Sequence, residues 1–151
     1  MKNLPAIICM VLLFLCTLTT LSQQSLSSRP SLFAKLPSVI NCTATQLDTI
    51  FSPSANQLIN ISFGKILFLS GTVKSNTQKY KNLQTVVIKL SVFQNILFTI
   101  SKITNEDNSF TYVAHLYDRA YADGYELKKT DQLNYQFIKV AMEEVLPVCN
   151  Q

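Results

Sequence analysis

The sequence has few of the residues on which catalytic and phosphate-binding sites are built. Its single histidine is His115, and its three glycines are Gly64, Gly71 and Gly124, which are too scattered for a glycine-rich phosphate loop. His115 lies on a predicted strand without an identifiable catalytic partner, and a histidine on the sheet surface is the simpler interpretation. We therefore predict no cofactor and no phosphate site.

The sequence has two carboxylate pairs, but neither they nor its serines stand in a pattern typical of catalysis. The pair Glu106 and Asp107 falls in a predicted turn, and Glu143 and Glu144 are adjacent on a predicted helix, where neighbouring side chains do not face each other. No serine stands in a nucleophile-elbow sequence. We therefore predict that the chain has no catalytic residues and is not an enzyme.

Charge is absent between Lys2 and Arg29. The strongly apolar part of this stretch, Ile7 to Leu18, has the length of a signal-peptide core and is short for a membrane span. Thr20 and Ser22 supply small residues at positions −3 and −1 of a cleavage site. We predict that residues 1–22 are a signal peptide; the alternative is an uncleaved anchor that holds the domain on a membrane.

Removing 22 residues from 151 leaves 129, which is the size of one domain with a hydrophobic core. Loss of Lys2 lowers the net charge from +4 to +3. The lysines are scattered apart from a loose cluster between Lys74 and Lys81, so no nucleic-acid partner is predicted, and any attraction to anionic surfaces is unspecific. No later segment is apolar enough to span a bilayer, so the mature chain is predicted to be extracellular and secreted.

Two of the four cysteines, Cys9 and Cys16, belong to the leader. The remaining pair, Cys42 and Cys149, is predicted to form one disulfide in an oxidising compartment. It would close a loop of about 107 residues and contribute about 4–5 kcal/mol on the chain-entropy model. Free thiols or intermolecular pairing are the alternatives, whereas two isolated cysteines and one histidine lack the spacing of a metal site.

Two glycosylation sequons agree with export. Asn41-Cys42-Thr43 and Asn60-Ile61-Ser62 both fit the acceptor pattern, and we predict N-linked glycans on Asn41 and Asn60. The first sequon contains the predicted disulfide cysteine, so glycan addition and disulfide formation compete at Asn41.

Residues 23–39 are rich in serine and contain Pro30 and Pro37, which predicts a flexible arm. Residues 40–151 are predicted to form a single globular domain. Thr43 and Gln46 fit a capping box, and Leu47, Ile50 and Phe51 fall on one face of a short helix.

Alternating side chains predict strands at residues 59–63, 65–74, 84–94, 96–103 and 110–117, with Gly71 as a bulge and residues 75–83 as a loop. Residues 118–129 are predicted to be a loop or a last strand. Residues 131–146 place Leu133, Phe137, Ala141 and Val145 on one stripe, which predicts an amphipathic helix. The predicted fold is α+β: an antiparallel sheet of four to six strands with a short N-terminal helix and a C-terminal helix packed on one face.

This outline is similar to the wrapped helix of cystatins and to helix-grip cavity folds. A cystatin inhibitor would be expected to carry a Gln-x-Val-x-Gly wedge in a hairpin. Gln84-Thr-Val-Val-Ile88 matches its first and third positions only, with Ile88 in place of the glycine. The fold outline alone does not fix a function.

We consider two functions. The first is a secreted, glycosylated binding protein that acts by protein–protein contact, as an extracellular ligand or inhibitor-like module. Its predicted recognition surface consists of Tyr112, Tyr117, Tyr121 and Tyr125, because tyrosines are rigid and amphipathic; packing at the edge of the core is the alternative reading.

The second function is an extracellular carrier of a small apolar ligand, held in a cavity between the sheet and the C-terminal helix. The side chains expected to line this cavity are Ile66, Phe68, Ile88, Leu90, Phe98, Ile100, Phe137 and Ile138. A solid core made of the same residues is the simpler alternative, and only a cavity of several hundred cubic ångströms would favour the carrier.

Overall fold

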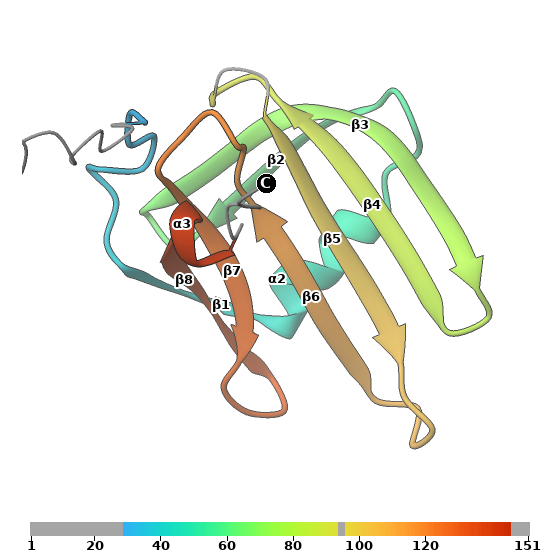
Figure 1. Cartoon of the computed structure of the whole chain (residues 1–151). Helices are drawn as coiled ribbons and strands as arrows, with labels where there is room; N and C mark the ends of the chain where they lie inside the picture. The colour runs from blue at the N-terminus through green and yellow to red at the C-terminus, as the bar shows by residue number, and fades with distance from the viewer. Residues whose placement is uncertain (1–28, 94–95, 146–151) are drawn as a thin grey trace, which may run out of the picture.

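The computed structural model describes residues 29–93 and 96–145. These residues form one sheet of eight antiparallel strands in the order β1-β8-β7-β6-β5-β4-β3-β2. The strands are β1 (Val39–Thr43), β2 (Leu58–Phe63), β3 (Leu67–Tyr80), β4 (Leu83–Leu90), β5 (Leu97–Thr104), β6 (Phe110–Leu116), β7 (Asp123–Lys129) and β8 (Asn134–Ala141). Consecutive strands pair from β2 to β8, and β1 pairs with β8, so β1 and β2 are the two edges of the sheet. The sheet curls into a nearly closed, barrel-like shape (Figure 1).

The predicted α+β fold with four to six strands is wrong. The regular secondary structure of the described residues is nearly all in the eight-stranded sheet, and the helices are short: α2 (Ala44–Asp48), the 3-10 turn η2 (Thr49–Phe51) and α3 (Met142–Val145). The apolar face of the sheet is buried because the sheet curls around it, and no long helix among the described residues packs on that face. None of the helices in the described ranges is long and apolar enough to cross a membrane.

The helix predicted for residues 131–146 is instead strand β8, followed by the single turn of α3. Tyr135 and Phe137 point to the interior, and β8 pairs with β1 on one side and β7 on the other. The predicted stripe repeated every four residues. Four is a multiple of the strand period of two, so the same positions also share one face of a strand.

Large apolar side chains fill the inside of the sheet. Phe63 and Phe98 both pack against Phe137, with ring centroids 4.9 and 6.1 Å apart, and all three are 0% exposed. Of the side chains predicted to line a ligand cavity, Ile88, Leu90, Phe98, Ile100 and Phe137 belong to this core, whereas Ile66 and Phe68 are exposed on the outer surface. Those five residues therefore pack in the continuous core.

The short N-terminal helix is confirmed. The Thr43 side chain accepts a hydrogen bond from the amide of Gln46, and the Gln46 side chain accepts one from the amide of Thr43, which makes the predicted capping box. Leu47, Ile50 and Phe51 are buried, as their spacing predicted. The predicted strands at 59–63, 84–94, 96–103 and 110–117 correspond to β2, β4, β5 and β6, and residues 118–129 contain β7.

The region from Gly71 to Leu83 differs from its prediction. Residues 75–80 continue β3 instead of forming a loop, and they make a long hairpin with β4. Gly71 stays in register, while the bulges lie between Val73 and Ser75 and between Gln78 and Tyr80. Gly71 is needed for close approach of the strands, because a Cβ there would lie 2.3 Å from the carbonyl oxygen of Lys89.

Residues 30–38, predicted to be part of the flexible arm, pack against the domain. Phe33 is 1% exposed, and its ring lies 5.2 Å from those of Phe93 and Tyr125. The carboxylate of Asp123 accepts hydrogen bonds from the Ser31 hydroxyl and from the amides of Leu32 and Phe33. We call residues 30–38 the N-terminal strap.

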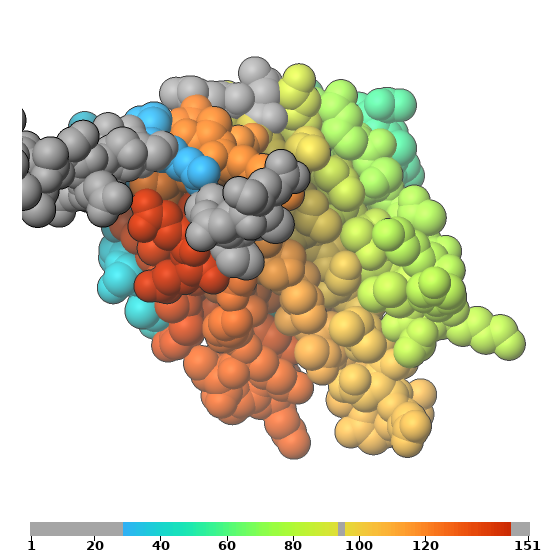
Figure 2. Space-filling model, viewed as in Figure 1, coloured from blue at the N-terminus to red at the C-terminus, as the bar shows by residue number. Residues whose placement is uncertain are grey.

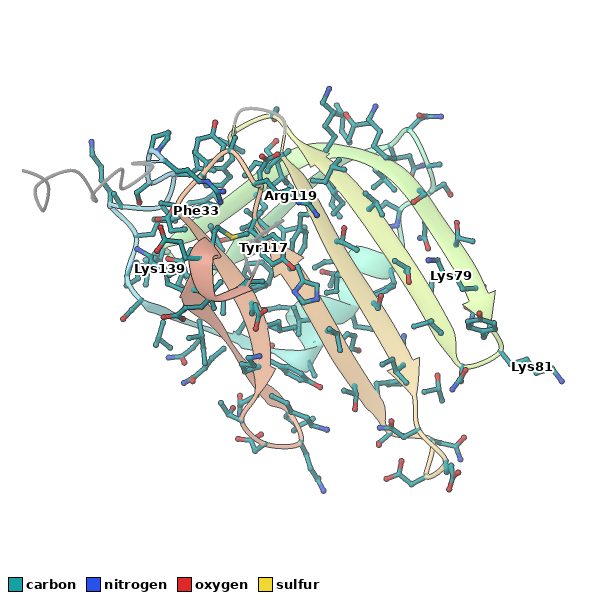
Figure 3. All side chains as sticks on the ribbon, in the orientation of Figure 1. Phe33, Lys79, Lys81, Tyr117, Arg119 and Lys139 are labelled. Atoms are coloured by element: carbon teal, nitrogen blue, oxygen red, sulfur yellow. The ribbon has the colours of Figure 1, made fainter. Side chains whose placement is uncertain are left out.

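The opposite side of the strap is held by Lys139. Its ammonium group donates to the carbonyl oxygens of Phe33 and Leu36 at 2.7 and 2.6 Å, and the Tyr125 hydroxyl donates to that of Pro37 (Figure 3). Serine and proline content predicted mobility, but one buried aromatic ring and these hydrogen bonds fix the strap. The described domain therefore starts before residue 40.

Candidate functional site

The sheet is incomplete between β6 and β7. β6 pairs with β5 along its whole length, but it pairs with β7 only at His115↔Glu126 and Leu116↔Tyr125. The N-terminal half of β6 and the C-terminal half of β7 therefore diverge, and part of the edge of β6 has no neighbouring strand. An unpaired edge inside a sheet is a place where polar backbone groups need other partners.

Tyr135 of β8 supplies two of these partners. Its hydroxyl accepts a hydrogen bond from the amide of Tyr112 at 3.3 Å and donates to the carbonyl oxygen of Phe110 at 3.5 Å. The Tyr135 ring is 1% exposed and lies edge-on to Tyr112, with centroids 5.6 Å apart. One buried side chain thus replaces part of the missing strand.

A charged cluster lies beside the gap. Lys102 donates to Asp48 at 2.6 Å and lies 4.3 Å above the centroid of the Phe110 ring, while the Tyr112 hydroxyl donates to Asp48 at 3.1 Å. The hydrogen bond from Lys102 is the main cause that lowers the pKa of Asp48, and burial is the main cause that raises the pKa of Tyr112. Asp48 is therefore charged and Tyr112 neutral at physiological pH, so this cluster joins α2 to β5 and β6.

A groove of about 390 Å³ opens where β6 and β7 diverge. Its lining comes from the start of α2, from β6, and from the turns at the ends of the β5–β6 and β7–β8 hairpins: Ala44, Asp107, Ser109, Phe110, Tyr112, Lys129, Gln132 and Leu133. Figure 2 shows the tips of these two hairpins standing apart at the lower edge of the molecule. We call this hollow the hairpin groove, and its volume lies in the range of small-molecule and peptide-side-chain sites.

The hairpin groove has apolar walls and a charged rim. Phe110 is 42% and Leu133 68% exposed, although both are large apolar residues. Hydrogen bonds from the hydroxyl and the amide of Ser109 are the main causes that lower the pKa of Asp107, and the charge of Lys129 makes the smallest contribution. A wider, more open hollow of about 650 Å³ continues past the β5–β6 turn and shares Asp107, Ser109 and Lys129. The arrangement can therefore bind an apolar group and orient a polar one.

The four tyrosines of the predicted recognition surface do not form one exposed patch. Tyr112 and Tyr125 are 4% and 0% exposed and face the interior, and Tyr117 and Tyr121 are half-buried. Burial raises the pKa of Tyr125 to about 12. Of the four, only Tyr112 lines the hairpin groove, and it contributes to the floor of the groove as a buried residue.

Cys42 faces the interior of the sheet and is 4% exposed. Burial raises the pKa of its thiol to about 12, so the thiol is protonated at neutral pH and reacts slowly in the folded chain. Its predicted disulfide partner, Cys149, lies outside the described residues. The disulfide stays a prediction.

Both sequon asparagines are exposed on edge strands of the sheet. Asn41 is in β1 and Asn60 is in β2, and each alternates with inward-pointing apolar residues. The Asn41 side chain accepts a hydrogen bond from Gln136 at 3.0 Å. Glycans on these two side chains would stand outside the sheet, and their presence stays a prediction.

His115 is half-buried on β6, and its Nδ1 atom is buried without a hydrogen-bond partner among the described residues. Its ring lies 5.5 Å from that of Tyr117. Within residues 29–93 and 96–145, no group of three or more histidine, cysteine or acidic side chains is placed to hold a metal ion. Glu143 and Glu144 fall in α3, and Glu106 and Asp107 in the turn after β5, where the sequence placed them.

Comparison of the chain with models of protein families, with curated proteins and with solved structures finds no match. The hairpin groove is therefore interpreted from its own chemistry. Lys129 and Leu133 were not predicted as site residues, because the groove exists only through the divergence of two strands, and sequence periodicity does not show that divergence. The one local feature of the sequence that pointed to this groove was an apolar residue, Leu133, among the polar residues of a turn.

We predict that Tyr135→Phe lowers the free energy of unfolding by about 1–3 kcal/mol, because the buried amide of Tyr112 loses its partner. The matched control is Tyr80→Phe, whose side chain is 69% exposed and which should change stability by less than about 0.5 kcal/mol. Urea unfolding followed by circular dichroism measures both. Equal stabilities of the two variants would show that the edge of β6 does not depend on Tyr135.

Proposed function

We propose that the chain is an exported binding protein that acts by protein–protein contact, with the hairpin groove as its contact site. The observation that carries this proposal is the break in strand pairing between β6 and β7, flanked by two exposed apolar side chains, Phe110 and Leu133. Backbone edges and exposed apolar groups are both costly unless a partner covers them.

The groove suits an extended segment of a partner protein. A peptide that lies along β6 would add main-chain hydrogen bonds to the edge groups that Tyr135 does not already bind, as in recognition by strand addition. Its alternate side chains would contact Phe110 and Leu133, while Lys129 and Asp107 offer one donor and one acceptor at the rim. Main-chain pairing gives affinity in this mode, and the apolar walls select the side chains.

Export is supported by the sequence. The apolar leader with small residues before Gln23 predicts entry into the secretory pathway, and the two sequons have exposed asparagines, as glycan transfer requires. A secreted protein without a catalytic constellation most often acts by binding. The proposed partner is therefore an extracellular protein that binds in the hairpin groove.

A carrier of a small apolar ligand is the second candidate. The helix that would have closed its cavity is strand β8, and five of the expected lining residues belong to the core. The observation that keeps this candidate is the volume of the hairpin groove, about 390 Å³, which is large enough for a small ligand. The ligand would bind between the hairpins and not in the interior.

Mass spectrometry of the chain secreted by a eukaryotic cell tests export. We expect a species that begins at Gln23, carries N-linked glycan, and gains two hydrogen atoms on reduction if Cys42 and Cys149 are bonded. Retention of residues 1–22 would contradict the secreted protein. A native spectrum that loses a discrete small molecule on denaturation would favour the carrier instead.

Selection of peptides from a random library displayed on phage tests the groove. We expect the selected sequences to alternate apolar and polar residues. We also expect Leu133→Arg to abolish their binding, because the variant places a charged side chain in the apolar wall of the hairpin groove. Leu58→Arg is the matched control, since Leu58 is 80% exposed on β2 and Leu133 is 68% exposed. Equal binding to both variants would show that the selected peptides use another surface.

A further inference from the structure

The acidic and basic residues are divided along the chain. No aspartate or glutamate occurs from Thr49 to Asn105, whereas eight of the nine acidic residues lie from Glu106 onward. The acid-free segment contains six lysines: Lys65, Lys74, Lys79, Lys81, Lys89 and Lys102. A random arrangement would mix the two signs, so the division points to a surface with one sign of charge.

The fold turns this division into one half of the sheet. The acid-free segment forms β2, β3, β4 and β5, which are consecutive neighbours in the strand order. Lys102 is neutralised by Asp48 at 2.6 Å. The other five lysines are exposed, and neither of the ion pairs found among the described residues, Lys102–Asp48 and Lys128–Glu126, involves them. Lys65 lies in the turn between β2 and β3, at the other end of β3 from the remaining four, and we call Lys74, Lys79, Lys81 and Lys89 the lysine face.

The long β3–β4 hairpin carries four of the five charges. β2 stops at Leu58↔Thr72, so β3 beyond Ser75 pairs with β4 alone and projects from the body. Lys79 and Lys81 flank the exposed Tyr80 at the tip, where Figure 3 shows Lys81 directed away from the molecule. Lys74 precedes Lys79 by five residues, a separation of about 17 Å along an extended strand.

Lys89 adds a fourth ammonium group to the hairpin, on β4 beside β3. It pairs with Thr72, two residues before Lys74, so both ammonium groups leave from the outer face of the sheet. The acid-free segment ends at the β5–β6 turn, where Glu106 and Asp107 are the first carboxylates. A line of lysines without intervening acids attracts a linear polyanion. This electrostatic attraction becomes weaker as the salt concentration rises.

We propose that the lysine face binds a sulfated polysaccharide chain. Such a chain is a flexible polymer with closely spaced negative groups, and it matches ammonium groups that are spread along a ribbon and act as point charges. The exposed ring of Tyr80, between Lys79 and Lys81, can pack against the apolar face of a sugar ring. This site lies on strands other than those of the hairpin groove.

Two other polyanions fit the surface less well. Nucleic-acid binding surfaces favour arginine and successive stacking aromatics, whereas the lysine face has lysines only and a single tyrosine at the hairpin tip. A bilayer would have to contact Phe68, which pairs with Ser62 of β2 close to Asn60. A glycan on Asn60 would hold a membrane away from this apolar side chain, while the hairpin tip stays free.

Binding of the mature chain to heparin at physiological ionic strength tests the proposal. We expect Lys79→Gln with Lys81→Gln to weaken heparin binding by about tenfold, because two counterion-releasing contacts are lost. The matched control is Lys35→Gln with Arg119→Gln, which removes the same charge from exposed positions outside the lysine face and outside both ion pairs, and it should change binding less than about twofold. Circular dichroism confirms that both variants are folded.

Equal losses in the two double variants would overturn the proposal, because net charge alone would then explain binding. Tighter binding to an RNA homopolymer or to anionic phospholipid vesicles than to heparin would overturn the choice of polysaccharide. That choice rests on the proposed export of the chain. Mass spectrometry of the secreted chain decides export separately, so failure of the lysine face and failure of the proposed function give different results.

Discussion

The short connection between the two edge strands is the constraint on which the rest of the structure depends. β1 and β2 are the opposite edges of the sheet, and the chain between Thr43 and Leu58 holds only α2 and the 3-10 turn η2, so the two edges stay close and one face of the curled sheet is directed inward. The enclosed space is then filled by large side chains such as Phe63, Phe98 and Phe137. Burial of these apolar surfaces stabilises a fold that contains few helical residues.

The candidate site lies where strand pairing in the sheet is interrupted. β6 and β7 pair at two residues and then diverge, whereas β5–β6 and β7–β8 on either side pair along their lengths. Tyr135 satisfies part of the exposed edge from inside, and the two hairpins beside the gap form the walls of the hairpin groove. The N-terminal strap, through Phe33 and the carboxylate of Asp123, is fixed elsewhere on the domain and leaves the groove lining to other residues.

Local features were predictable from the sequence, but the closure of the sheet was not. The capping box at Thr43 and the alternation in β4 to β6 depend on neighbours in sequence, so they were found. β8 was mistaken for a helix because residues four apart share a face in both structures. The groove residues Phe110, Lys129 and Leu133 come together only through long-range pairing. The division of charges along the chain becomes a basic surface only because β2 to β5 are neighbours in the sheet.

Native-state hydrogen exchange at Ala114 tests directly whether the pairing of β6 with β7 ends at His115. The amide of Ala114 lies two residues beyond that of Tyr112 on the same edge of β6, where ladder pairing with β7 has ended. We expect the amide of Ala114 to exchange much faster than that of Ile100, the residue opposite it in β5, because β5 is paired on both sides. Equal protection of the two amides would mean that the β6–β7 ladder is continuous, and it would contradict the gap on which the proposed binding site depends.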